Sequence, residues 1–163
     1  MQIQRTGSRR HHIAVIDGPN MSNLGARSKK VFGSIGSLDD LKRYVAEFGV
    51  QLGVEVESFS SNYEGAILEY IHESATRVDA YIINPAGLTA TGGAVRHALQ
   101  ETERPVIEVH FANRAAASHP VPSAFTHTAT GMFMGLRQYS YVAALLSLTL
   151  ALDDETFLGA APA

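Results

Sequence analysis

The chain has 163 residues, of which 45% are hydrophobic and 18% charged, and its formal net charge is -3 at pH 7. This length suits one domain with a real core and is too short for two ordinary domains. The mild negative charge gives no basic field for nucleic acid, and no apolar run approaches the roughly 18 residues of a transmembrane helix. The absence of cysteine removes thiolate catalysis, disulfides and cysteine-based zinc sites, and fits a cytoplasmic location.

Short apolar runs alternate with stretches of helical period along the chain, which is the pattern of a parallel sheet built from βαβ units. The predicted strands cover residues 13–16, 54–60, 80–83, 105–110 and 130–134. The predicted helices cover residues 38–52, 64–77, 94–101 and 139–152. Ser37, which has an acidic residue three places later, predicts the N-cap of the first of these helices.

The order of these elements predicts an α/β, flavodoxin-like three-layer sandwich with a five-stranded parallel sheet in the order 2-1-3-4-5. We expect a disordered lead-in at residues 1–11, a single domain at 12–153 and a fraying tail at 154–163. Right-handed crossovers bring the carboxyl ends of all five strands to one edge of the sheet. Ligand sites of this fold class form at that edge.

The segment at residues 17–33 follows the first predicted strand and is rich in glycine, asparagine and basic residues. It is long for a connection inside a compact domain, and such loops are often lids or binding loops. A mobile surface loop is the alternative interpretation. A second irregular segment, at residues 111–128, follows the fourth predicted strand.

Polar side chains interrupt the apolar strands where the strands end. Histidine changes its charge near neutral pH, so His110 could carry protons, and Glu108 lies on the same strand face and could orient it. Arg27 could hold an anion, and Asn20 and Asn84 could place a water or an oxyanion. A lone histidine is more often structural, but convergence at one edge favours a site. Walker, GxGxxG, GxSxG and metal-binding histidine patterns are absent, which leaves acid/base chemistry without cofactor or metal on a small anionic molecule.

Five segments resemble the type II 3-dehydroquinate dehydratases: IDGPNMSNLGAR, SSNYEGAILEYIHES, INPAGLTATGGAVRHAL, IEVHFAN and ATGMFMGLRQYSYVAAL. The resemblance covers about residues 12 to 150. It implies a flavodoxin-like subunit, trimers assembled into a homododecamer, and no cofactor. It also implies loss of water from a cyclic keto-acid through an enolate, with a tyrosine of the first loop as base and a histidine of the fourth strand as acid.

Individual residues of this chain match roles in that family. His110 resembles the general acid and Glu108 its neighbour. Asn20 resembles the asparagine that holds the enolate-stabilising water, and Arg27 the arginine that lowers the pKa of the tyrosine. Asn84 resembles an asparagine that contacts the substrate.

Other positions depart from the family pattern. Phe32 stands where the family has its tyrosine, and a benzene ring has no proton to exchange. Ala90 replaces a histidine, His97 replaces an acidic residue, and the sequence VPSAF at 121–125 stands where the family has an arginine. In the family the missing histidine, acidic residue and arginine contact ring hydroxyls of the substrate.

The retained asparagine and histidine, with the backbone amides of Phe111 and Ala112, serve the substrate's carboxylate and reacting carbonyl in that family. We therefore predict a dehydratase-type lyase that acts on a small cyclic carboxylate or dicarbonyl with fewer hydroxyls than 3-dehydroquinate. Three groups are candidates for the general base: His110, a water ordered by Asn20, and His97 supplied across a trimer interface. The alternatives are a genuine 3-dehydroquinate dehydratase, a non-catalytic ligand-binding paralogue, and an FMN-binding flavodoxin, for which the phosphate cradle is missing.

Overall fold

The five strands form one parallel sheet in the order β2-β1-β3-β4-β5, which confirms the predicted α/β fold and strand order. The computed structural model describes residues 3–157, so predictions for residues 1–2 and 158–163 lie outside the described chain. The strands are β1 (His12–Asp17), β2 (Glu55–Ser60), β3 (Ala80–Asn84), β4 (Val106–His110) and β5 (Gly131–Met134).

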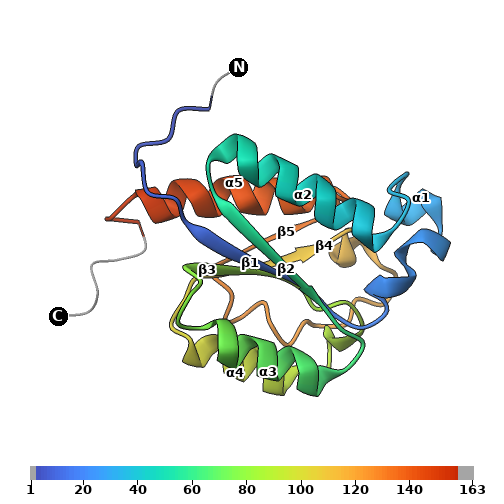
Figure 1. The fold of residues 1–163 in the computed structure, drawn as a ribbon. Coiled ribbons are helices and arrows are strands. Elements are labelled where there is room, and N and C mark those ends of the chain that lie inside the picture. Colours follow the sequence, from blue (N-terminus) through green and yellow to red (C-terminus); the bar gives the residue numbers. More distant parts are fainter. Residues whose placement is uncertain (1–2, 158–163) are drawn as a thin grey trace.

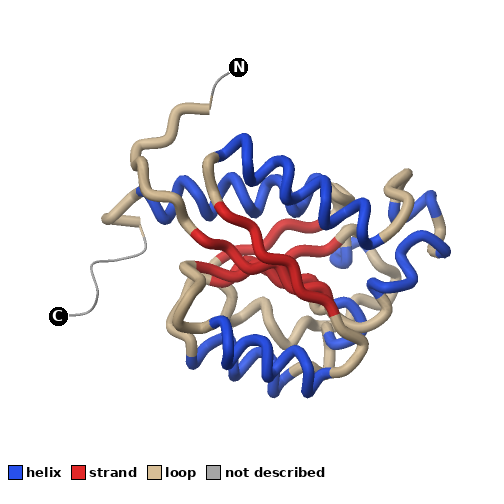
Figure 2. Tube along the Cα trace, in the orientation of Figure 1, coloured by secondary structure: helices blue, strands red, loops and turns tan. Residues whose placement is uncertain are grey.

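Helices cover both faces of this sheet (Figures 1 and 2). One layer holds α2 (Leu38–Leu52) and α5 (Tyr139–Asp153), and the other holds α3 (Glu64–Ser74) and α4 (Gly93–Glu101). The Ser37 side chain accepts a hydrogen bond from the Asp40 N–H at 3.0 Å, as the sequence predicts for the start of α2. None of the described helices combines the length and the apolar character needed to cross a membrane.

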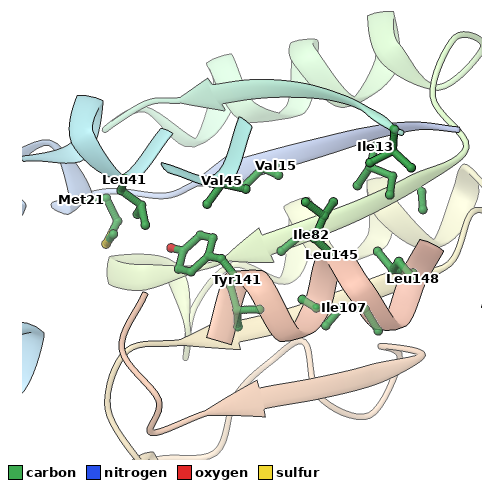
Figure 3. Packing of buried hydrophobic residues seen from close by; sticks show 14 of the residues in the cluster. Ile13, Val15, Met21, Leu41, Val45, Ile82, Ile107, Tyr141, Leu145 and Leu148 are labelled. Atoms are coloured by element: carbon green, nitrogen blue, oxygen red, sulfur yellow. The ribbon is translucent and has the colours of Figure 1, made fainter. Parts of the chain in front are cut away.

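The core has two halves because successive side chains of a strand point to opposite faces. On β1, Ile13 and Val15 pack under α2 and α5, whereas Ala14 and Ile16 face α3 and α4. Figure 3 shows the first half, where Leu145 and Leu148 of α5 reach the sheet. Burial on both faces explains why the central strands are continuous apolar runs in the sequence.

The segment at residues 17–33 contains helical structure that the sequence does not predict. It includes a 3-10 helix, η1 (Met21–Ala26), and the short helix α1 (Lys29–Phe32), which lies beyond the end of the sheet (Figure 1). Met21 and Leu24 are almost fully buried and anchor this segment to the core. The four residues of α1 are too few to show a helical period, so tertiary contacts decide its structure.

Residues 3–11 have neither helix nor strand, yet two of them are tied to the end of α5. The Arg5 guanidinium donates to both carboxylate oxygens of Asp153, at 2.8 and 2.7 Å. The buried His11 lies with Nε2 2.7 Å from Asp153 Oδ1. These two residues of the lead-in therefore contact the end of α5.

Candidate active site

A cavity of about 280 Å³ opens at the carboxyl edge of the sheet, between the loops that follow β1, β3 and β4. Ligands of open α/β sheets bind at this edge. The cavity brings together seven of the residues that the sequence predicts for the site: Asn20, Arg27, Phe32, Asn84, His110, Phe111 and Ala112. Five further residues complete its lining: Met21, Ala86, Gly87, Thr89 and Arg114.

The loop after β1 is locked against the loop after β3. The Gly18 N–H donates to the Asn84 carbonyl at 2.9 Å, and a Cβ at Gly18 would collide with the Pro85 carbonyl oxygen. Asn20 has a left-handed backbone (φ 76°), a conformation that asparagine tolerates better than most residues. Its N–H donates to Asn62 Oδ1 at 2.8 Å, so the backbone is fixed while the side chain lines the cavity.

Arg27 stands over the Phe32 ring, with its guanidinium carbon 3.8 Å from the ring centroid. Within residues 3–157, no carboxylate lies at ion-pair distance from Arg27. Burial lowers the pKa of Arg27, although a guanidinium remains charged at neutral pH. A partly desolvated cation with no acidic neighbour is suited to bind an anion.

Aromatic rings form one wall of the cavity. The Phe32 and Phe111 ring centroids are 5.8 Å apart, and Phe111 meets Tyr141 at 5.7 Å in an edge-on arrangement. No tyrosine is among the described residues that line the cavity. Phe32 offers an apolar surface beside Arg27. Its ring carries no hydroxyl and so has no proton to exchange.

His110 is held by a buried carboxylate. Its Nε2 lies 2.6 Å from Glu108 Oε1, and Glu108 is fully buried behind it. Burial would raise the pKa of Glu108, but hydrogen bonds from His110, Ser123 and Thr126 outweigh it and lower the pKa. Because an ionised carboxylate only accepts hydrogen bonds, Nε2 carries the proton. The other ring nitrogen, Nδ1, has no hydrogen-bond partner among the described residues.

Asn84 is fixed by a buried polar chain. Its Nδ2 donates to the Tyr141 hydroxyl at 2.7 Å, and that hydroxyl donates to Asp17 Oδ1 at 2.5 Å. Asn84 Oδ1 accepts from the Ala86 N–H at 3.1 Å. Burial raises the pKa of Asp17 to about 6, and burial with the neighbouring Asp17 raises the pKa of Tyr141. This network sets the orientation of the Asn84 carboxamide.

Ala90 and His97 do not join this cavity. Ala90 is exposed in the turn after β3. His97 lies on the exposed side of α4, with Nε2 3.8 Å from Glu101 Oε1. Across residues 3–157, no three histidine or acidic side chains gather as metal ligands would.

Sequence reasoning missed three kinds of contact. Arg114 brings a second cation to the cavity, and its position soon after His110 could have suggested it. Thr89 also lines the cavity and donates to the Ala86 carbonyl at 2.7 Å. Ser123 and Thr126, which hold Glu108, lie in an irregular segment where the sequence gives no signal of their direction.

Comparison with known proteins gives consistent matches. The family model described as "Dehydroquinase class II" matches residues 11–149. The "Catabolic 3-dehydroquinase" of Talaromyces marneffei is 38% identical over 147 residues, which cover 89% of this chain and 83% of that protein. The "3-dehydroquinate dehydratase" of Caldicellulosiruptor bescii is 38% identical over 143 residues, 86% of this chain and 98% of that protein. The crystal structure of type II dehydroquinase from Propionibacterium acnes has a TM-score of 0.80 at 32% identity, covering 86% of this chain and 99% of that one.

Proposed function

Because this chain belongs to the class II dehydroquinase family, we propose that it catalyses a cofactor-free, dehydratase-type elimination on a small cyclic carboxylate or dicarbonyl. The substrate carries fewer hydroxyls than 3-dehydroquinate. The observation that carries this proposal is the cavity itself: it joins a carboxylate-bound His110 to an unpaired Arg27, but Phe32 stands beside Arg27 and no tyrosine lines the described cavity. The active form is a trimer-based homododecamer, as the family resemblance implies.

The acid and base roles follow from the chemistry of His110. The Nδ1 lone pair removes a proton from the carbon next to the ring carbonyl and leaves an enolate. The imidazolium, stabilised by Glu108, then gives a proton to the hydroxyl that departs from the neighbouring carbon. The products are water and a conjugated enone. A water held by Asn20, or His97 of a neighbouring copy, is the alternative base.

Other groups bind rather than transfer protons. Arg27 attracts the substrate's carboxylate or the enolate oxygen, and Asn20 and Asn84 offer carboxamides to the same oxygens. Phe32 and Phe111 cover the carbon skeleton of the ring. Few polar side chains remain in the lining for additional hydroxyls, and a hydroxyl without a partner costs binding free energy.

A second candidate is a genuine 3-dehydroquinate dehydratase. The observation that favours it is the similarity to relatives that bear that name, over nearly the full length of both chains. A non-catalytic paralogue is the third candidate, although a pure scaffold would need neither an unpaired Arg27 nor the buried pair of Glu108 and His110.

The test compares 3-dehydroquinate with 1-hydroxy-3-oxocyclohexanecarboxylate, which keeps the leaving hydroxyl and lacks the other two. Product formation is followed by the absorbance of the conjugated enone, for the wild type and Phe32→Tyr. We expect the wild type to have the higher kcat/KM for the less hydroxylated compound. Faster turnover of 3-dehydroquinate by the wild type would favour the second candidate. Binding of both compounds without any turnover would favour the third.

A further inference from the structure

A second cavity lies beside the cavity of the candidate active site, which we call the catalytic cavity. It lies between β5 and the irregular segment that follows β4. Its volume is about 270 Å³. Three consecutive residues of the segment and two methionines of β5 give it apolar walls: Pro120, Val121, Pro122, Met132 and Met134. We call this space the apolar compartment.

The apolar compartment and the catalytic cavity share two lining residues, His110 and Arg114. Arg114 also donates a hydrogen bond to the Val121 carbonyl at 2.9 Å, which connects the shared wall to the wall of the compartment. A molecule that reacts at His110 therefore lies next to this space. A substituent on that molecule could extend past Arg114 into it.

The polar atoms deep in the compartment are already bonded to one another. Glu108 Oε1 accepts from Ser123 at 2.5 Å and lies 2.6 Å from His110 Nε2, and Glu108 Oε2 accepts from Thr126 at 2.6 Å. A hydroxyl placed against these atoms would find few free partners in the protein, which is unfavourable. An apolar group has no hydrogen bonds to lose, and its burial is favourable.

We propose that the apolar compartment holds an alkyl or aryl substituent of the substrate. This inference rests on the proposed function, and it narrows the substrate to a cyclic carboxylate that carries a hydrophobic group. The carboxylate lies near Arg27, the ring lies at His110, and the substituent lies between Val121 and the methionines of β5. A cavity of about 150 Å³ can hold benzene, so the volume is sufficient for a six-membered ring.

The test measures the affinity of two probes by calorimetry: 3-oxocyclohexanecarboxylate and its 5-phenyl derivative. We expect the wild type to bind the phenyl derivative at least tenfold more tightly, about 1.4 kcal/mol. In Val121→Asp we expect the two probes to bind with nearly equal affinity, because a charged side chain disfavours burial of the phenyl group beside it. Val121 is 56% exposed, so the substitution does not disturb the core. The matched control is Val50→Asp on α2, where Val50 is 78% exposed, and it should keep the wild-type ratio.

Three outcomes would overturn the inference. Equal affinities for the two probes in the wild type would show that the apolar compartment binds no substituent, and they would leave the proposed function intact. A ratio that survives in Val121→Asp would mean that the phenyl group binds elsewhere. If neither probe binds, the anion site is wrong, and the proposed function is overturned together with the inference.

Discussion

The two edges of the sheet differ in how their charged side chains are paired. At the amino edge, several charged side chains are paired within the protein. Arg5 and His11 share Asp153, and Arg77 binds Glu57 through its guanidinium at 2.5 Å. The hydrogen bond from Arg5 outweighs burial and holds the pKa of Asp153 well below its usual value. The first two contacts join the lead-in to the end of α5, and the third joins β2 to the segment that follows α3.

At the carboxyl edge, the two arginines that line the candidate active site lack acidic partners, although Arg43 pairs with Asp40 at the start of α2. Neither Arg27 nor Arg114 forms an ion pair within residues 3–157. The one carboxylate of β4, Glu108, is bonded to His110. Paired charges stabilise a fold, whereas unpaired cations around an oriented histidine are suited to a ligand that supplies the negative charge. Substitutions of Arg27 and His110 on one side, and of Arg5 on the other, should therefore separate activity from stability.

The largest effect is expected for His110→Ala. If His110 transfers the proton, kcat for the preferred keto-acid falls about 10³-fold, the scale of general acid–base catalysis. The enone absorbance assay measures it, with the circular dichroism spectrum as a check that the fold persists. His97→Ala is the comparison variant and should keep the wild-type kcat. A large loss of kcat in His97→Ala, without one in His110→Ala, would indicate that His97 of a neighbouring copy of the chain is the base.

Asp17→Asn should stabilise the protein at neutral pH. The pKa of Asp17 is raised from 3.8 to about 6 by burial, so folding favours its protonated form. Stability from this group is fully present below pH 3.8 and is lost as the pH rises through about 6. At 1.36 kcal/mol per pH unit, that interval corresponds to about 3 kcal/mol.

Urea unfolding at pH 3.5 and pH 7.5 measures this effect. The free energy of unfolding of Asp17→Asn, relative to the wild type, should increase by about 3 kcal/mol between the two pH values. An equal difference at both pH values would show that Asp17 does not titrate in this range.

Arg27→Gln should weaken substrate binding without unfolding the protein. Removing a charge-assisted contact with an anion costs about 2 kcal/mol, which is roughly a 30-fold rise in KM. Steady-state kinetics measures KM, and Lys29→Gln, at an exposed position of the same loop, serves as the control. If the two variants change KM equally, the effect comes from the general charge of the loop.

The smallest effect is expected for Arg5→Gln at the amino edge. Loss of the ion pair with Asp153 should lower the free energy of unfolding by about 1 kcal/mol, because His11 still contacts that carboxylate. The kcat/KM value should not change. Urea unfolding checks the first result, with the exposed Arg9→Gln as control. A fall in kcat/KM would contradict the separation of the two edges.

The sequence by itself determined the fold and the edge of the sheet at which the candidate site lies. Continuous apolar runs such as residues 80–83 indicate strands buried on both faces, and alternation with helices indicates a parallel sheet. That topology brings the ends of β1, β3 and β4 together, so Asn20, Asn84 and His110 meet in one cavity, as their positions in the sequence suggest.

Only the tertiary structure decided how these groups are held and what surrounds them. Tyr141 reaches Asp17 across 124 positions of the sequence, and Thr126 reaches Glu108 from an irregular segment. Periodicity describes which face of an element is apolar, but it does not fix the direction of a side chain in a loop. The pairing of distant residues comes from the packing of the layers. The apolar compartment beside His110 could therefore not be predicted from the sequence.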